Sequence, residues 1–202
     1  MVTKDFNFCI GFLFAVTLLS ISFFFLPTYF WTLFPLSLFW LSMYSWLFEN
    51  QQVKKLHLSH WFLSLASGLI LYLFFAFGKW LIKISGIPLM DQLQTLYALV
   101  KPTDWLHYVW LFIIIIPGEE WFWRGFIVKR LSKETTLYKA SIIGTFLYGS
   151  AHLVTGSLLL VLAALFGGFL WSILYLKTRN ILVPIISHLF FDVLLLILFP
   201  LV

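Results

Sequence analysis

The sequence predicts an all-α membrane protein, a bundle of about seven spanning helices. Of its 202 residues, 62% are hydrophobic and only 10% are charged. A soluble domain could not bury that much apolar surface. The apolar residues also fall into stretches of roughly 20, the length of a membrane-spanning helix, and short segments that carry most of the charges separate them. These observations together favour a multipass membrane protein.

The apolar stretches can be taken in chain order. The first is long enough to span and is not followed by an Ala-x-Ala-like cleavage motif, so we expect it to remain as a helix. Pro27 marks the turn into the second stretch. Asn180 followed by Pro184 suits the start of the last, because proline is tolerated in the first turn of a helix. The stretches are 6–26, 29–48, 61–82, 105–131, 140–154, 158–176 and 182–201.

Lysine and arginine residues fall mainly at alternate ends of these stretches, which predicts the orientation of the chain. Because cytoplasmic loops carry the excess of positive charge, we expect the N-terminus in the cytoplasm and the C-terminus outside. Segment 85–104 has apolar residues near helical spacing and is expected to form an amphipathic helix on the outer surface, a connector rather than a lid. The predicted cytoplasmic residues are Lys4, Lys54, Lys55, Lys129, Arg130, Lys133, Lys139, Lys177 and Arg179, against Lys79, Lys83 and Lys101 outside.

Residues 1–202 are expected to form a single membrane domain, with N-terminal helices and the connector in 1–104 and the polar motifs in 105–202. The net charge of +5 does not indicate nucleic-acid binding, because no basic patch is interleaved with stacking aromatic residues. Cys9 is the sole cysteine, which excludes an internal disulfide, and its apolar neighbours favour a buried thiol. Scarce alanine beside 24 phenylalanines favours an AT-rich bacterial genome, and hence a bacterial cell membrane.

Two adjacent acids and an arginine interrupt the fourth apolar stretch. Glu120 and Arg124 are four residues apart on one helix face and can pair, whereas Glu119 is displaced by about 100° and has no local cation. An ionisable residue at bilayer depth costs roughly 3 kcal/mol, so such groups face a protein interior or a water-filled cavity. Glu120 and Arg124 are therefore expected to be a structural pair, and Glu119 is left free for chemistry.

Three further polar residues interrupt later apolar stretches: His152, His188 and Asp192. Counting from the predicted cytoplasmic helix ends at 1.5 Å per residue brings them and Glu119 to similar depths. Any one of them alone would suit an interhelical hydrogen bond. Together they favour a catalytic site. Tyr148 lies one turn before His152 on the same face, where it could bind substrate or fill space, and we favour the second.

This set of residues suits hydrolysis by activated water. A carboxylate and a histidine that share one water can activate it, with Glu119 taking the proton. A second histidine and a short polar side chain can then stabilise the oxyanion. A zinc site stays an open option. Glu119, His152 and His188 could hold Zn²⁺ together with one water, although the His-Glu-x-x-His pattern is absent.

At these positions the sequence resembles the CAAX-protease and bacteriocin-processing (CPBP, or Abi) family of intramembrane proteases. The resemblance covers the second half of the chain, and each motif lies on its own predicted helix. The motif Glu-Glu-x-x-x-Arg matches Glu119, Glu120 and Arg124; Phe-x-x-x-His matches Tyr148 and His152, with tyrosine for phenylalanine; and His-x-x-x-Asn/Asp matches His188 and Asp192.

The resemblance implies roles for these residues. Glu119 would be the general base, His152 its partner, and Arg124 a supporting residue. His188 and Asp192 would act on the oxyanion side, although a carboxylate at Asp192 must be protonated to donate to an oxyanion and otherwise orients His188. The need of the family for a metal is contested, so zinc stays open.

We therefore expect a multipass membrane endopeptidase that contacts membrane lipids and cleaves a peptide precursor or a lipidated protein. Two other classes remain as alternatives. The chain could be a non-catalytic membrane partner or immunity protein, as some family members are, with the polar cluster serving stability. A proton-coupled carrier could also use a buried glutamate and histidines, but no pair of Gly/Pro-interrupted helices occurs in corresponding halves.

Overall fold

The computed structural model describes residues 6–51 and 53–202 of the chain. Most of these residues are helical and none of them lies in a β-strand, which confirms the predicted all-α fold. Lys4, which contributed to the predicted orientation, lies outside the described residues. The α-helices are α1 (Phe6–Ser20), α2 (Phe30–Phe48), α3 (Leu58–Ser85), α4 (Met90–Val100), α5 (Trp105–Val109), α6 (Ile116–Phe122), α7 (Lys129–Glu134), α8 (Leu137–His152), α9 (Leu158–Thr178) and α10 (Leu182–Asp192).

Short π-helical segments extend or join several of these helices. Ile21–Phe25 continues α1, and Val193–Leu198 continues α10. Trp110–Ile115 and Trp123–Val128 join α5, α6 and α7 into one continuous helix, Trp105–Glu134, which we call the central rod. The helices therefore coincide with the predicted apolar stretches to within a few residues at each end.

Two local features explain how the central rod begins and where it departs from regular α-helix. Asp104 caps it, because its Oδ1 accepts hydrogen bonds from the backbone N–H of Leu106 at 2.9 Å and of His107 at 3.2 Å. Pro117 lies in the first turn of α6 and has no N–H to donate to the preceding turn. The regular hydrogen-bond ladder is interrupted there, next to a π-helical segment.

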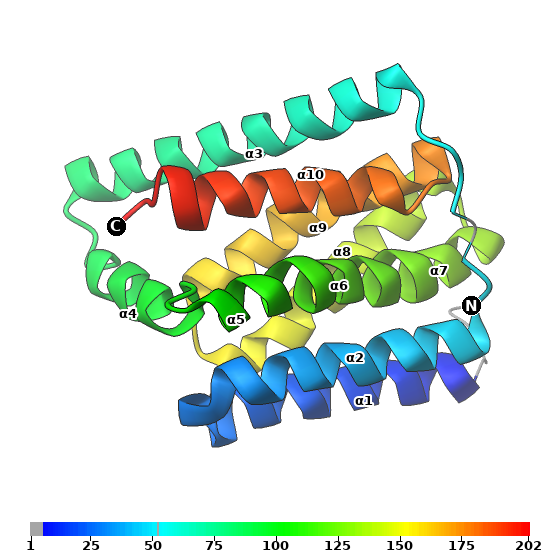
Figure 1. Ribbon diagram of the computed structural model, residues 1–202, viewed down its shortest axis with the longest axis horizontal. Helices are drawn as coiled ribbons and strands as arrows, with labels where there is room; N and C mark the ends of the chain where they lie inside the picture. Colours follow the sequence, from blue (N-terminus) through cyan, green and yellow to red (C-terminus); the bar gives the residue numbers. More distant parts are fainter. Residues whose placement is uncertain (1–5, 52) are drawn as a thin grey trace.

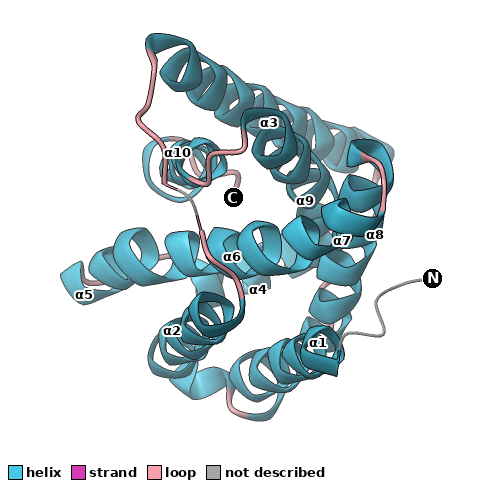
Figure 2. Cartoon of the chain, turned by 90° about the vertical axis from the view of Figure 1, so that its right-hand side faces the viewer, coloured by secondary structure: helices cyan, strands magenta, loops and turns pink. Residues whose placement is uncertain are grey.

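The central rod lies in the middle of the bundle (Figure 1). α2 packs against α6 on one side, and α10 packs against α6 on the other. α3 lies beside α10 at one edge and α1 beside α2 at the other edge, as the rotated view also shows (Figure 2). α8 and α9 pack on each other and complete the bundle. The polar residues of α6 are thereby enclosed by other helices.

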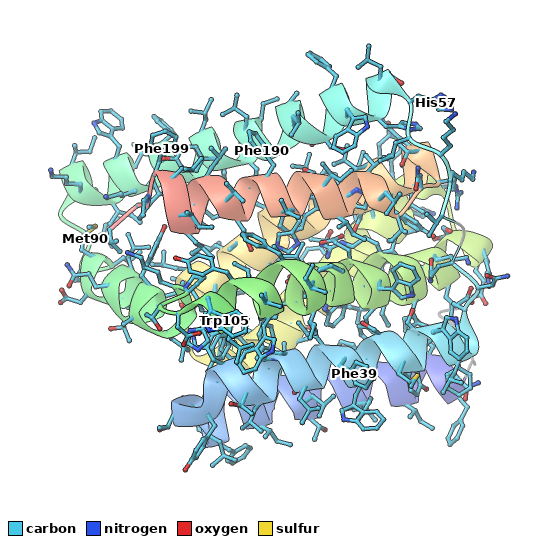
Figure 3. All side chains as sticks on the ribbon, viewed as in Figure 1. Phe39, His57, Met90, Trp105, Phe190 and Phe199 are labelled. Atoms are coloured by element: carbon cyan, nitrogen blue, oxygen red, sulfur yellow. The ribbon has the colours of Figure 1, made fainter. Side chains whose placement is uncertain are left out.

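Large apolar side chains cover the outside of the bundle, as in a protein surrounded by lipid (Figure 3). Phe39 projects from α2 and is 47% exposed. Cys9 is also exposed, so the predicted burial of this thiol is wrong. An apolar neighbourhood in the sequence does not tell a lipid-facing position from a core position, because both are apolar in a membrane protein.

By length and composition, three helical segments of the described chain are suited to cross a membrane: Phe6–Phe25, Leu58–Ser85 and Leu158–Thr178. A fourth candidate is the pair Met90–Val100 and Trp105–Glu134, which bends by 94°. The membrane character of the bundle is thus confirmed. The number of about seven spans, and the single-domain division at residue 104, remain predictions.

The predicted cytoplasmic segments meet at one end of the bundle. Arg179 Nη1 donates to Ser132 Oγ at 3.2 Å, and Asn180 Nδ2 donates to the backbone oxygen of Lys54 at 3.0 Å. The α2–α3 loop, α7 and the end of α9 therefore lie together, as the charge pattern requires. Which side of the membrane this end faces remains a prediction.

Candidate active site

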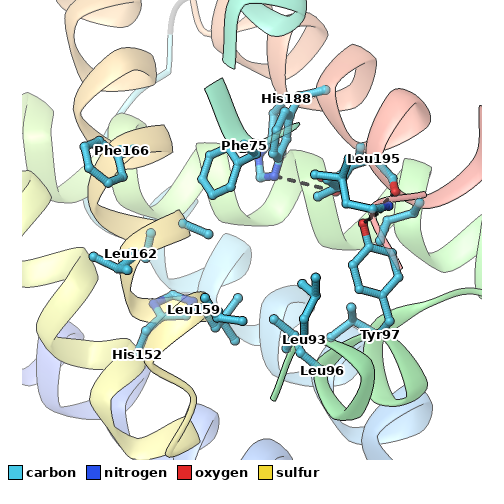
Figure 4. A pocket seen from close by; sticks show the side chains of 18 of the residues that line it. Phe75, Leu93, Leu96, Tyr97, His152, Leu159, Leu162, Phe166, His188 and Leu195 are labelled. Carbon is cyan, nitrogen blue, oxygen red and sulfur yellow. Dashed lines mark hydrogen bonds and ion pairs between the residues drawn. The ribbon is translucent and has the colours of Figure 1, made fainter. Parts of the chain in front are cut away.

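A cavity of about 330 Å³ is lined by residues of α2, α3, α4, α8, α9, α10 and the central rod. Most of its lining is apolar, contributed by side chains such as Phe75, Leu93 and Leu195 (Figure 4). Five of the predicted site residues also line it: Glu119, Tyr148, His152, His188 and Asp192. The structure therefore brings polar residues of three helices, the central rod, α8 and α10, to one apolar cavity.

The α4 helix contributes to this cavity as well. Leu93, Leu96 and Tyr97 all line it (Figure 4). The Tyr97 hydroxyl donates to the backbone oxygen of Leu195 at 2.9 Å and accepts from the backbone N–H of Leu201 at 2.9 Å. α4 is therefore the predicted amphipathic helix, but it forms part of a cavity wall and is more than a connector.

Glu119 lies at the centre of the site and is 7% exposed. Its Oε1 accepts a hydrogen bond from the Tyr148 hydroxyl at 3.2 Å. The same oxygen lies 4.0 Å from His152 Nε2, and Oε2 lies 3.9 Å from His188 Nε2. Both separations are too long for a direct hydrogen bond, and a water molecule can bridge polar atoms at this distance.

The orientation of His152 follows from the end of α8. Its Nδ1 lies 2.9 Å from the backbone oxygen of Tyr148, one turn earlier. Because a carbonyl oxygen only accepts, Nδ1 carries the proton, and Nε2 of the neutral ring is free to accept. The Tyr148 ring packs edge-on against the imidazole, with centroids 4.5 Å apart. Nε2 is thereby directed to the Glu119 side of the cavity.

Glu120 and Arg124 form the expected pair, and it is buried. Arg124 Nη1 donates to Glu120 Oε1 at 3.0 Å, with side chains 1% and 0% exposed. Glu120 Oε1 also lies 2.9 Å from His188 Nδ1. A carboxylate oxygen accepts this bond, so Glu120 joins Arg124 to a histidine on α10. The sequence did not indicate this link, because helix periodicity does not show which face of α10 meets α6.

Asp192 lies one turn after His188, and its Oδ2 is 3.7 Å from His188 Nε2. That distance exceeds a hydrogen bond, whereas Glu120 contacts the opposite nitrogen directly. The orientation of His188 is therefore set by Glu120 at Nδ1 and not by a hydrogen bond to Asp192. Asp192 and the Nε2 edge of His188 face the same cavity.

The three candidate zinc ligands are not arranged around a common ion. Among residues 6–51 and 53–202, no group of three or more His, Cys, Asp or Glu side chains is placed to hold a metal. Two ligands of one tetrahedral zinc ion lie about 3.3 Å apart, given bonds of roughly 2.0 Å. The Glu119 oxygens are instead 4.0 and 3.9 Å from the nitrogens of His152 and His188. The donor types suit zinc, but their spacing in this arrangement does not.

Residues 101–194 match the model of one protein family, described as type II CAAX prenyl endopeptidase Rce1-like. This part of the chain is therefore similar to that family. The match spans the central rod, α8, α9 and most of the last helix, and it includes Glu119, His152, His188 and Asp192. It confirms the family resemblance inferred from the motifs, and the Rce1-like family supports a membrane protease function. No curated protein and no solved structure matches the chain.

Proposed function

We propose that this protein is an intramembrane endopeptidase in which Glu119 and His152 activate a water molecule to hydrolyse a peptide bond. The observation that carries the proposal is the separation of 4.0 Å between Glu119 Oε1 and His152 Nε2, each buried and facing one cavity. A water between them can donate one hydrogen bond to the carboxylate and one to the imidazole. Its oxygen lone pair is then free for a substrate carbonyl.

The reaction balances with these residues alone. As the water oxygen attacks the carbonyl carbon, Glu119 takes a proton from it, and the carbonyl oxygen becomes an oxyanion. When the carbon–nitrogen bond breaks, Glu119 returns that proton to the leaving amine. The products are a carboxylic acid and an amine, and the carboxylate of Glu119 is restored.

The oxyanion needs a hydrogen-bond donor on the far side of the cavity. With His188 Nδ1–H donated to Glu120, His188 Nε2 can donate when the ring carries both protons. Three carboxylates lie around that ring, with oxygens at 2.9, 3.7 and 3.9 Å from its nitrogens, and these support the imidazolium form. We assign His188 to the oxyanion and Asp192 to the charge balance of His188. A protonated Asp192 would donate to the oxyanion instead.

The cavity also supports a substrate class. Around Glu119 the cavity has apolar walls, to which α3, α4 and α9 contribute. Such walls favour a membrane-associated peptide precursor or a lipidated protein, because burying the apolar parts of such a substrate away from water is favourable. We place the enzyme as a multipass protein of a bacterial cell membrane, in contact with membrane lipids.

Glu119→Gln tests the proposal, because glutamine keeps the size of the side chain and cannot take the proton. We expect peptides cleaved in cells with the intact protein to remain uncut in cells with Glu119→Gln, as measured by mass spectrometry of membrane peptides. Glu134→Gln is the matched control, since Glu134 is exposed at the end of α7. Cleavage that persists in Glu119→Gln at wild-type rate would overturn the assignment.

Zinc held by Glu119, His152 and His188 is the competing proposal, and it requires these donors to move together. With water activated by Glu119 and His152 alone, the purified protein should retain its activity after dialysis against a strong zinc chelator. Activity that the chelator abolishes and added Zn²⁺ restores would favour the metal site. The zinc content of the active protein, measured by elemental analysis, checks the same point without relying on activity.

A further inference from the structure

Trp171 on α9 contacts the site from a direction that none of the sequence motifs indicates. The residue is 3% exposed. Its indole is stacked on the imidazole of His188, with centroids 3.8 Å apart and planes 19° from parallel. The guanidinium carbon of Arg124 lies 5.2 Å from the centroid of the same indole. Trp171 therefore touches both the proposed oxyanion donor and the arginine that pairs with Glu120.

His188 needs such a contact to hold a fixed orientation. Its one direct side-chain hydrogen bond in the described part of the chain runs from Nδ1 to Glu120. Nε2 is 3.7 Å from Asp192 and 3.9 Å from Glu119, too far for a second direct bond. A single in-plane hydrogen bond fixes one ring atom and leaves the ring free to tilt. An aromatic ring stacked on its face limits that tilt.

The indole is itself held in place. Trp171 Nε1 donates to Ser187 Oγ at 3.3 Å, and Ser187 Oγ lies 2.8 Å from Ser67 Oγ. Ser67 Oγ in turn donates to the backbone oxygen of Ser64 at 3.0 Å. The Ser67 and Ser187 hydroxyls are buried between α3 and α10, so the indole is anchored to α10, the helix that carries His188, and through it to α3.

Gly167 makes the room for this arrangement. It lies one turn before Trp171 on α9, and a Cβ at position 167 would meet Trp171 Cζ3 at 2.7 Å. That is closer than real Cβ contacts, so any side chain here would push the indole from its present place. The position of the indole can thus be changed without removing it.

We propose that Trp171 is a positioning residue for His188: its stacked indole, anchored through Ser187, holds the imidazole at the tilt in which Nε2 meets the oxyanion. The proposal rests on the proposed peptidase function. It assigns to Trp171 an effect on the rate of the chemical step and not on substrate binding. The proposal requires an aromatic ring at position 171, because the stacked ring is what limits the tilt of the His188 imidazole.

The test uses the full-length protein purified in detergent and a library of fluorescence-quenched peptides, with and without a prenylated cysteine. The best-cleaved member serves as substrate. We expect Trp171→Leu to lower kcat by roughly 10- to 100-fold with KM within about twofold, as for a catalytic group displaced by about 1 Å. Trp171→Phe keeps a stacking ring and should recover about a tenth or more of the wild-type kcat. Gly167→Ala should lower kcat by about three- to tenfold.

Trp40→Leu is the matched control, because Trp40 lies on the exposed side of α2 and is 49% exposed. Its kcat should equal that of the wild type. All rates are compared per folded protein, measured by size-exclusion chromatography and thermal unfolding. If Trp171→Leu does not fold, Trp171→Phe and Gly167→Ala carry the test.

Three results would overturn the inference while the peptidase function stands. They are an unchanged kcat in the folded Trp171 and Gly167 variants, an equal loss of kcat in Trp171→Leu and Trp171→Phe, and a rise in KM alone, which would make Trp171 a substrate contact. If the wild-type protein cleaves no member of the library while Glu119→Gln and wild type behave alike in cells, the function and the inference both fail.

Discussion

Glu119 and Glu120 are adjacent acids with different surroundings, and the difference follows from helix geometry. The two side chains leave the helix about 100° apart. Glu120 faces Arg124 and α10, where its Oε1 accepts from two donors at 3.0 and 2.9 Å. Glu119 faces the cavity, where its Oε1 accepts a hydrogen bond from the Tyr148 hydroxyl at 3.2 Å. One acid is thereby used for structure, and the other keeps an oxygen available to water.

Tyr148 allows the roles of a ring and of a hydroxyl to be separated. Its hydroxyl donates to Glu119, and its ring contacts His152 and lies 4.7 Å from the Arg124 guanidinium carbon. Because water can replace one hydroxyl in a polar cavity, we expect Tyr148→Phe to keep kcat within about tenfold of the wild type. Tyr148→Leu removes the ring and should lose more, since His152 and Arg124 both lose packing. Peptide cleavage kinetics of both purified variants measure this, and an equal loss would show that the hydroxyl matters more than the ring.

At the scale of the helices, the central rod is held near both of its ends. Asp104 caps its start, and near its other end α7 contacts the loop that follows α2. Glu49 of that loop is buried, and its Oε1 accepts from Arg130 Nε at 3.0 Å and from Lys133 Nζ at 2.6 Å. Lys129 also lies within 3.3 Å of the other carboxylate oxygen. This carboxylate therefore links α2 to α7 and fixes the position of the rod on which Glu119 and Glu120 lie.

The Glu49 link predicts a dependence of stability on pH. Burial by itself raises the pKa of Glu49, but the hydrogen bonds and charges of Lys133 and Lys129 outweigh it, so the pKa is lowered from its ordinary value of 4.5. A lowered pKa in the folded state means that the carboxylate stabilises the fold above about pH 4.5, and that this contribution is lost as the pH falls through the lowered value. We expect Glu49→Gln to reduce the free energy of unfolding by about 1.5–3 kcal/mol at neutral pH.

Unfolding in detergent between pH 3 and pH 7 measures this effect. The difference between the wild type and Glu49→Gln should be constant near neutral pH and shrink under acid conditions. Glu134→Gln again serves as the control, because Glu134 is exposed. A difference that grows as the pH falls would contradict the assignment of Glu49.

For the molecule as a whole, the sequence predicts the helices and the convergence of the polar residues better than it predicts their contacts. Apolar stretches show where helices run, and counting at 1.5 Å per residue brings Glu119, His152 and His188 to one level. The rotation of each helix about its axis depends on packing, which a nearly uniform apolar sequence does not specify. For this reason the bond from His188 to Glu120, the stacking of Trp171 and the exposure of Cys9 were not predicted.

The orientation of the bundle in the membrane is set by charge and stays a prediction. The α2–α3 loop lies at the basic end, and the segment after α4 lies at the other end of the bundle (Figure 1). Because an excess of Lys and Arg is retained on the cytoplasmic side, Lys55 is expected inside and Lys101 outside. In a Cys9→Ser background, a membrane-impermeant thiol reagent should label Lys101→Cys in intact cells. The same reagent should label Lys55→Cys only after the cells have been lysed. The opposite pattern would invert the orientation and place the α4 wall of the cavity on the cytoplasmic side, so that substrates would have to arrive from within the cell.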